Sequence, residues 1–370
     1  MMNKLIDKSD VLSNISFVIS LICLIVNIII LFQIISISKC NGAEFKLEYD
    51  QHFSTSSGVV NTKTVYDTLS VIQDETVDRV RFKLIGSGIL AFPINVAGHE
   101  LYGHGYPLRV YDIPRKYNIW PPQVSHLKSK DLIINSQVIL GGIKFDREYE
   151  DSFVKDGIVE NFNYRNSINI FFSELSYVTT MWFSEETDID NYITNINKMN
   201  SNTDIDDYLE NSIYLSLINP SFLLSSYILG KTLWTDQDRK YVLDYLPTIS
   251  FNMYSTAVTR ELGLSINVTS LIYGYDFIDR MIHKCQYMRL TYEFGQDVYN
   301  EKVNGFSFEY TTIPICNNIS TDIKIHHVEN CVSDTLVTLN FEHLYFRWKH
   351  RLENFDELEP TDKFSVGYRF

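Results

Sequence analysis

The hydrophobic pattern of the chain changes its period near Leu246, and this change limits the folds open to the sequence. Before that point apolar residues recur at helical spacing. After it they alternate with polar residues in short runs, as in antiparallel strands. Helical or apolar patterns cover residues 82–97, 138–154, 164–183, 189–199 and 204–233. We expect Pro220 to divide the last of these into two helices.

The second half predicts about seven strands with connections of hairpin or short-loop length. They lie near residues 249–253, 262–268, 288–294, 306–310, 323–325, 337–341 and 364–370. One further strand is expected near 45–49, and a polar segment follows it to about residue 78. The predicted fold class is α+β, with a strand and polar segment at 44–80, a helical region at 81–245 and an antiparallel β region at 246–370.

The β region fits two architectures. Its seven strands and the strand near 45–49 total eight, an even number that can close a barrel. The terminal alternation of Phe364, Val366, Tyr368 and Phe370 resembles the last strand of bacterial outer-membrane β-barrels. A soluble antiparallel sheet or sandwich alternates in the same way, so barrel and sheet stand as equal alternatives.

The N-terminal segment predicts export from the cytoplasm. Residues 15–37 are almost all apolar and uncharged, and the run is long enough to span a hydrocarbon core of roughly 30 Å. Residues 1–43 are either a signal peptide, which we favour, or a membrane anchor. We expect the protein in the membrane or the cell envelope, with the bacterial outer membrane as one alternative.

Charge and cysteine content add two constraints. The formal net charge of -14 argues against a nucleic-acid partner, because neutralising phosphates requires an excess of Lys and Arg. Cys316 and Cys331 lie in the strand-rich region, where neighbouring strands could bring them into a disulfide in an oxidising compartment. The alternative is two buried thiols.

The most specific motif is the octet at 98–105, which reads Gly-His-Glu-Leu-Tyr-Gly-His-Gly at the end of the apolar run. Two imidazoles and a carboxylate are the components of a zinc site with a general base. His99 and His104 are five residues apart, so on a regular helix their rings would point roughly 140° apart. A single widened π-turn would bring both rings to one metal, and Gly103 supplies the conformational freedom for it.

This octet resembles the His-Glu-x-x-Gly-His motif of the dipeptidyl-peptidase III family of zinc metallopeptidases, and only Tyr102 departs from the usual string. The resemblance implies zinc on His99 and His104, Glu100 as general base, and a downstream glutamate as third ligand. It covers about seven residues of 370. The octet is also similar to bacterial envelope proteins in which a Gly-Gly-containing helix follows, here at 141–143, with a Tyr-Arg-Asn stretch at 164–166.

For the third metal ligand the sequence offers several carboxylates. Glu148 is our first choice, and it shares one helix face with Lys144 and Asp151 at i, i+4 and i+7 spacing. Gly141 and Gly142 would let this helix approach a neighbour closely. The equal alternative is an ordinary solvated stripe. Glu150 and Glu160 follow as candidates, and weaker ones are Glu174, Glu185 and Glu186.

The other histidines give weaker signals. His126 follows Pro121-Pro122 in an expected loop, and His326 and His327 are adjacent on an expected strand and so face opposite sides. His343 and His350, with Trp348, have the character of strand or interface residues.

These observations favour a membrane-associated zinc metallopeptidase of the bacterial cell envelope. A water activated by the metal would hydrolyse a peptide bond with Glu100 as general base, and the partners would be the membrane and a peptide or protein substrate. The alternative is an outer-membrane β-barrel with a structural or interaction role, in which the metal motif is vestigial.

Overall fold

The computed structural model describes most of the chain from residue 46 onward. The described residues are 46–50, 52–118, 122–126, 131–183, 188–199, 213–254, 257–268, 286–297, 299, 301–316, 319–341, 343–353 and 362–369. The expected signal peptide or anchor at 1–43 lies outside them, as do Glu185 and Glu186.

The first half is helical, as predicted. Its elements are α2 (Thr55–Thr76), α3 (Val80–Gly98), the π-turn η1 (His99–His104), α4 (Gly105–Val110), α5 (Leu132–Glu160), α6 (Tyr164–Phe183), α7 (Asp188–Met199) and α9 (Pro220–Thr235). A two-stranded hairpin, β2 (Arg115–Asn118) and β3 (Gln123–His126), lies between α4 and α5. Asn219 caps α9, with its side-chain oxygen accepting from the Ser221 N–H, so the break predicted at Pro220 is confirmed.

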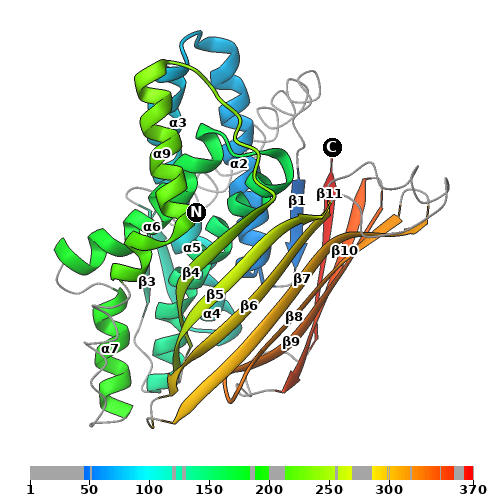
Figure 1. The fold of residues 1–370 in the computed structure, drawn as a ribbon. Coiled ribbons are helices and arrows are strands. Elements are labelled where there is room, and N and C mark those ends of the chain that lie inside the picture. Colours follow the sequence, from blue (N-terminus) through cyan, green and yellow to red (C-terminus); the bar gives the residue numbers. More distant parts are fainter. Residues whose placement is uncertain are drawn as a thin grey trace, which may run out of the picture. The chain divides into compact units, whose positions relative to one another are not determined.

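The second half is one large antiparallel sheet, so the α+β prediction is confirmed (Figure 1). Its strands are β1 (Lys46–Asp50), β4 (Tyr245–Met253), β5 (Ala257–Val268), β6 (Gln286–Asp297), β7 (Lys302–Cys316), β8 (Ile319–Val328), β9 (Val332–Asn340), β10 (Leu344–Glu353) and β11 (Asp362–Arg369). The nine strands follow the order β1-β11-β10-β9-β8-β7-β6-β5-β4. Within the described residues β1 and β4 are the two edges of a nine-stranded sheet, and a closed barrel, one of the two equal alternatives, is not seen.

Helix α5 lies against the inner face of this sheet (Figure 1). It packs on β4, β5 and β6, and its Lys155 reaches Glu309 of β7 at 3.0 Å. At the far side of the sheet α2 packs on β1, and Lys363 of β11 donates to the Tyr106 hydroxyl of α4. Because strands from both edges contact the same helical layer, the sheet bends around it.

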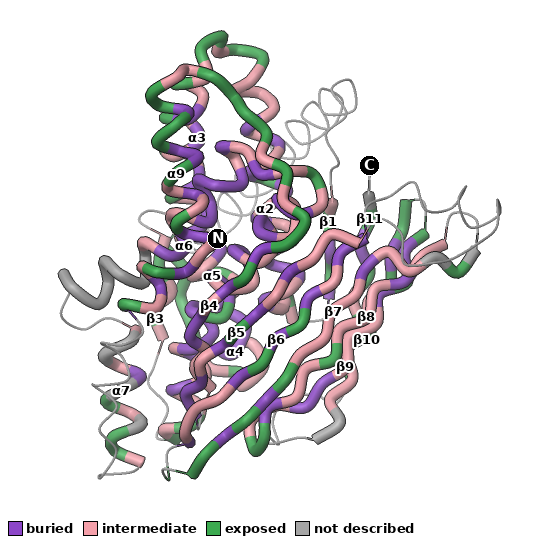
Figure 2. Tube along the Cα trace, in the orientation of Figure 1, coloured by how far each residue is buried: buried purple, intermediate pink, exposed green. Residues whose placement is uncertain are grey.

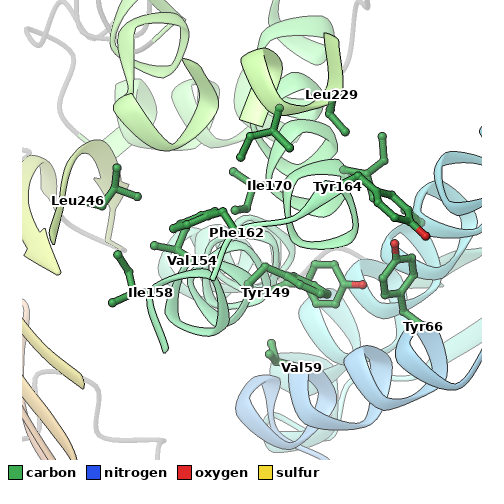
Figure 3. Packing of buried hydrophobic residues seen from close by; sticks show 14 of the residues in the cluster. Val59, Tyr66, Tyr149, Val154, Ile158, Phe162, Tyr164, Ile170, Leu229 and Leu246 are labelled. Atoms are coloured by element: carbon green, nitrogen blue, oxygen red, sulfur yellow. The ribbon is translucent and has the colours of Figure 1, made fainter. Parts of the chain in front are cut away.

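The main hydrophobic core lies among the helices (Figure 3). Tyr149 of α5 is fully buried and its hydroxyl donates to the Asn169 side chain of α6 at 3.1 Å. Tyr66 of α2 and Tyr164 of α6 meet at their hydroxyl ends beside it. Leu246 of β4 extends the same cluster to the sheet. Burying aromatic rings of this size contributes much of the apolar stabilisation, and it fixes α5 against α2 and α6.

The polar segment after the first strand, for which the sequence predicted no helix, forms α2, whose buried positions are mainly polar, among them Thr62, Thr64 and Ser70. The disulfide alternative is wrong: Cys316 pairs with Ile319 at one end of β8, and Cys331 follows the other end. A strand of that length separates them by roughly 30 Å, whereas the Cα atoms of a disulfide lie within about 7 Å.

One continuous helical segment, Val80–Val110, is long and apolar enough to cross a membrane by length and composition. Four of its exposed apolar side chains form one stripe, at Phe82, Ile85, Ile89 and Phe92.

Candidate metal centre

The motif at 98–105 forms the widened turn that its spacing predicts. Residues His99–His104 are a π-turn, and the N–H of Gly105 donates to the carbonyl of Glu100, five residues earlier. The wider turn brings the two imidazoles to the same side, with ring centroids 4.7 Å apart. Ligand atoms of His99, Glu100 and His104 all lie within 4.8 Å of one another, so this group could hold a metal ion.

Three glycines let α5 pack directly against the backbone of the π-turn. A Cβ atom at Gly103 would lie 2.6 Å from the Gly142 Cα, and one at Gly141 would lie 2.4 Å from the Gly103 carbonyl oxygen. A Cβ atom at Gly142 would lie 2.5 Å from the Nε2 atom of His99. The close helix approach expected from Gly141 and Gly142 is therefore confirmed, and the neighbour is η1.

Helix α5 also orients both histidine rings. The Nδ1 atom of His99 lies 2.9 Å from a carboxylate oxygen of Asp146, and the Nδ1 atom of His104 lies 2.7 Å from the carbonyl oxygen of Val138. Each Nδ1–H donates to its oxygen, which leaves both Nε2 atoms available as ligands. This is the arrangement in which metal-binding histidines are usually held.

A carboxylate that the sequence analysis did not consider lies between the two Nε2 atoms. Oδ2 of Asp188, the first residue of α7, is 3.2 Å from Nε2 of His99 and 2.9 Å from Nε2 of His104. Ligand atoms of a tetrahedral zinc site lie about 3.3 Å apart when the metal–ligand bonds are about 2.0–2.1 Å. The two distances from the Asp188 oxygen are close to this spacing, so Asp188 could share one metal ion with the two imidazoles.

The electrostatics of the cluster favour a cation. Burial lowers the pKa of His99, but Asp146 and Asp188 raise it more, so the net pKa is well above the usual value. The pKa of His104 is likewise raised, since Asp188 outweighs burial. Burial raises the pKa of Asp188, yet the two imidazoles bring it far below the usual range. Without a metal, protons occupy the positions that a divalent cation would take.

The Glu100 carboxylate forms a hydrogen bond outside the group of Asp188 and the two histidines. One of its carboxylate oxygens accepts from the backbone N–H of Val124 in β3 at 2.7 Å. This contact ties the β2–β3 hairpin to the π-turn and fixes the carboxylate beside the histidines. The side chains of His99 and Asp188 are 20% and 37% exposed, so small molecules in solvent can reach the cluster.

The structure does not bring the predicted third ligands to the histidines. Glu148 follows Asp146 by two residues on α5, which turns it roughly 200° away from the site. Its carboxylate accepts instead from Ser56 of α2 at 3.2 Å. Glu150 accepts from Ser221 at 3.1 Å and pairs with Arg147. Glu160 ends α5.

The remaining candidates also lie in other contacts. Glu174 is fully buried and binds Arg147 and Asn219. His126 pairs across the β2–β3 hairpin with Arg115. In the sheet, His326 contacts Glu293 at 2.8 Å, His327 contacts Ser333 at 3.2 Å and His350 contacts Asp362 at 2.9 Å.

Asp146 and Asp188 are the site residues that sequence reasoning missed. The resemblance implied a glutamate as the third ligand, so only glutamates were considered and neither aspartate was a candidate. The available signal was the polar break before the amphipathic pattern at 189–199, because an aspartate is common at the start of a helix. Comparisons with family models, curated proteins and solved structures gave no match for this chain.

Proposed function

We propose that the chain is a zinc-dependent peptidase whose metal ligands are His99, His104 and Asp188. The proposal rests on one observation, the convergence of two oriented Nε2 atoms and one carboxylate oxygen within 3.2 Å. Two nitrogens and one oxygen suit zinc, and three protein ligands leave a fourth position open, as catalytic zinc sites require. Zinc bound there would lower the pKa of a water toward 7 and polarise a substrate carbonyl.

Glu100 would act as the general base. Its neighbour in the chain is a ligand, and its own carboxylate is held by the Val124 N–H, so it lies beside the metal position without being needed as a ligand. There it would accept a proton from the attacking water and pass it to the departing amine.

The likeness of the octet to zinc peptidases supports a peptide or protein substrate. An exported, membrane-associated location follows from residues 15–37 and belongs to the same proposal.

The test is peptide hydrolysis by the Glu100→Gln variant. The amide keeps the size of the side chain and can still accept from Val124, so zinc content and unfolding temperature should match wild type. Removing the base should reduce turnover by about 10²- to 10⁴-fold. A peptide library assayed with zinc-loaded protein measures this.

Two outcomes would contradict the proposal. Equal cleavage by wild type and Glu100→Gln at equal zinc content would show that Glu100 is not the base. No cleavage of any peptide by zinc-loaded wild type would favour the structural role of the β region instead.

A further inference from the structure

The outer face of the sheet, turned away from the helices, is apolar over most of its area. Residues directly opposite one another on this face include Leu262 with Tyr292, Leu290 with Phe308 and Trp348 with Phe364. We call this surface the outer belt. Its members are Tyr49, Tyr245, Ile249, Leu262, Leu264, Ile266, Met288, Leu290, Tyr292, Phe294, Phe306, Phe308, Tyr310, Ile323, Ile325, Val337, Leu339, Leu344, Phe346, Trp348, Phe364, Val366 and Tyr368.

The exposure of the belt is unusual in both degree and extent. Tyr292, Phe306 and Phe364 are 50%, 52% and 69% exposed, and Figure 2 shows buried residues alternating with half-buried or exposed ones along the middle of β5 and β6. Nine strands at a spacing of about 4.8 Å, with belt positions over roughly 20 Å of strand length, give an area of about 700–800 Å². That exceeds the apolar patches of about 300–600 Å² found on typical soluble monomers.

The inner face of the same sheet is mainly polar. Arg289 of β6 pairs with Asp151 of α5 at 2.7 Å and with Glu261 of β5 at 2.5 Å. Arg347 of β10 pairs with Glu48 of β1 at 2.8 Å. A sheet in water has the opposite polarity, with apolar side chains against the core and polar ones in solvent. Apolar outside and polar inside is the pattern of strands that face hydrocarbon.

Most of the polar residues of the outer face gather toward one end of the sheet. This end lies where β4 meets β5, β6 meets β7, β8 meets β9 and β10 precedes β11. We call these residues the rim, and they are Arg260, Gln296, Lys302, Asn304, His327, Ser333, Thr335, His350 and Asp362. A polar end on the outer face of the sheet is expected where hydrocarbon gives way to water.

The two edge strands have backbone groups that side chains of the helical layer satisfy. Asn61 of α2 accepts from the Glu48 N–H and donates to the Glu48 carbonyl, both at 2.9 Å, and Thr64 donates to the Lys46 carbonyl at 2.6 Å. At the other edge, Asn219 accepts from the Ile249 N–H at 3.4 Å. Satisfied edges resist pairing with other strands and make contact with a water-free environment less costly.

We propose that the outer belt is a lipid-contacting surface, seated in the hydrocarbon of a bilayer with the rim at the water interface. Lipid fits better than a second copy of the chain because the sheet bends around its helices. The outer face is therefore convex, and two convex faces meet over a small area, whereas fluid acyl chains cover such a surface. Strands β4 to β10 have nine to fifteen residues, enough to match the roughly 9–11 needed to cross a bilayer, whereas β11 has eight and β1 has five. The inference is independent of the metal chemistry.

The test places a single tryptophan on the same face of the same strand at two heights. In the full chain, the four native tryptophans (Trp120, Trp182, Trp234 and Trp348) are replaced by Phe. One protein then carries Phe308→Trp in the belt, and its control carries Lys302→Trp in the rim, roughly 20 Å away along β7. Both are reconstituted into phosphatidylcholine vesicles with brominated acyl chains. Residues 15–37 are identical in both, so their membrane insertion cannot cause a difference.

We expect acyl-chain bromine to reduce the emission of the belt tryptophan at least twofold more than that of the rim tryptophan. Unfolding temperatures close to wild type show that both proteins are folded. Equal quenching at the two positions, strong or weak, would overturn the proposal. A dimer that forms through the belt in vesicles, with belt emission unaffected by bromine, would overturn it in favour of a second copy.

Discussion

At the scale of single residues, the orientation of the two histidine rings depends on groups that are not themselves candidate metal ligands. Asp146 and the Val138 carbonyl each accept from one Nδ1–H, at 2.9 and 2.7 Å, and so set which nitrogen of His99 and His104 faces Asp188. Asp146 is buried, and its second carboxylate oxygen has no hydrogen-bond partner within the described residues. Its charge thus acts mainly on His99.

The Asp146→Asn variant tests this role. The amide oxygen can still accept from Nδ1–H, but the charge that makes the imidazole a stronger ligand is lost. Zinc affinity should fall about 10- to 100-fold with little change in fold. A chelator competition titration measures the affinity, and Glu148→Gln, on the opposite side of α5, is the matched control. Equal affinities in Asp146→Asn and wild type would show that Asp146 does not support the site.

The sequence predicted the histidines and Glu100 of the centre but not Asp188, and the difference has a physical cause. His99, Glu100 and His104 lie within six residues, so their spacing carries the geometry, including the π-turn. Asp188 reaches them from 84 residues away through the packing of α7 on α5. Such a contact depends on tertiary packing, and carboxylate-rich sequence around it offered many equivalent candidates.

At the scale of elements, the distance between α5 and η1 decides whether the histidines can converge. Gly142 faces both imidazoles, and a Cβ atom there would lie 2.5 Å from His99 Nε2 and 2.7 Å from His104 Cε1. Any side chain at this position must displace a ring or move α5. The glycine is required by this close approach and not by its backbone angles.

The Gly142→Ala variant should therefore lose zinc affinity by at least about tenfold, because a displaced ligand ring changes the geometry that tetrahedral coordination requires. The control is Gly230→Ala in α9, where a Cβ atom meets nothing within 4 Å. That control should keep full affinity and gain about 0.5–1 kcal/mol of stability from the better helix propensity of alanine. Zinc titration and urea unfolding of both variants provide the comparison. An unchanged zinc affinity in Gly142→Ala would contradict the described packing.

The contact between α2 and α5 makes a prediction about pH. Lys63 of α2 lies 2.6 Å from Asp156 of α5 and 2.9 Å from Asp67. Burial lowers the pKa of Lys63, but the two carboxylates raise it more, so the folded pKa exceeds the unfolded value of 10.5. The stabilisation is therefore fully present below pH 10.5 and is lost as pH rises through the folded pKa.

Lys63→Met should lower the free energy of unfolding by about 1–2 kcal/mol at pH 7, because two carboxylates lose a charged donor. The difference from wild type should shrink only in strongly alkaline solution, above pH 10.5. Urea unfolding of the two proteins at pH 7, 9 and 11 measures the difference. A difference that disappears already between pH 7 and 9 would contradict the raised pKa.

At the scale of the whole described chain, the change of period near Leu246 predicted the division into helices and sheet. The spans at 164–183 and 189–199 agree with α6 and α7 almost residue for residue, because their amphipathic pattern is strong. The helix α2 was missed because threonine and serine occupy much of its buried side, so no apolar stripe marks it. Strand β10 was recognised only through Trp348 and His350, since Arg347 and Lys349 place charges on its inner face.

The edges of the sheet could not be predicted from alternation. Period two reports which residues share a face, but it carries no information about which strand follows which across the sheet. The neighbours β1 and β11 come from opposite ends of the described chain, paired from Lys46 with Arg369 to Asp50 with Ser365. Because of that pairing, β1 is an edge strand covered by α2. It does not pair with β4, which forms the opposite edge.

The central claim is that His99, His104 and Asp188 together hold one zinc ion, and metal analysis of matched variants tests it most directly. Wild type and Glu148→Gln, purified without chelator, should each contain one zinc per chain. His99→Ala, His104→Ala and Asp188→Asn should each contain much less, with Asp188→Asn retaining its fold by circular dichroism. Full zinc in Asp188→Asn would contradict the account, and so would equal metal content in wild type and both histidine variants.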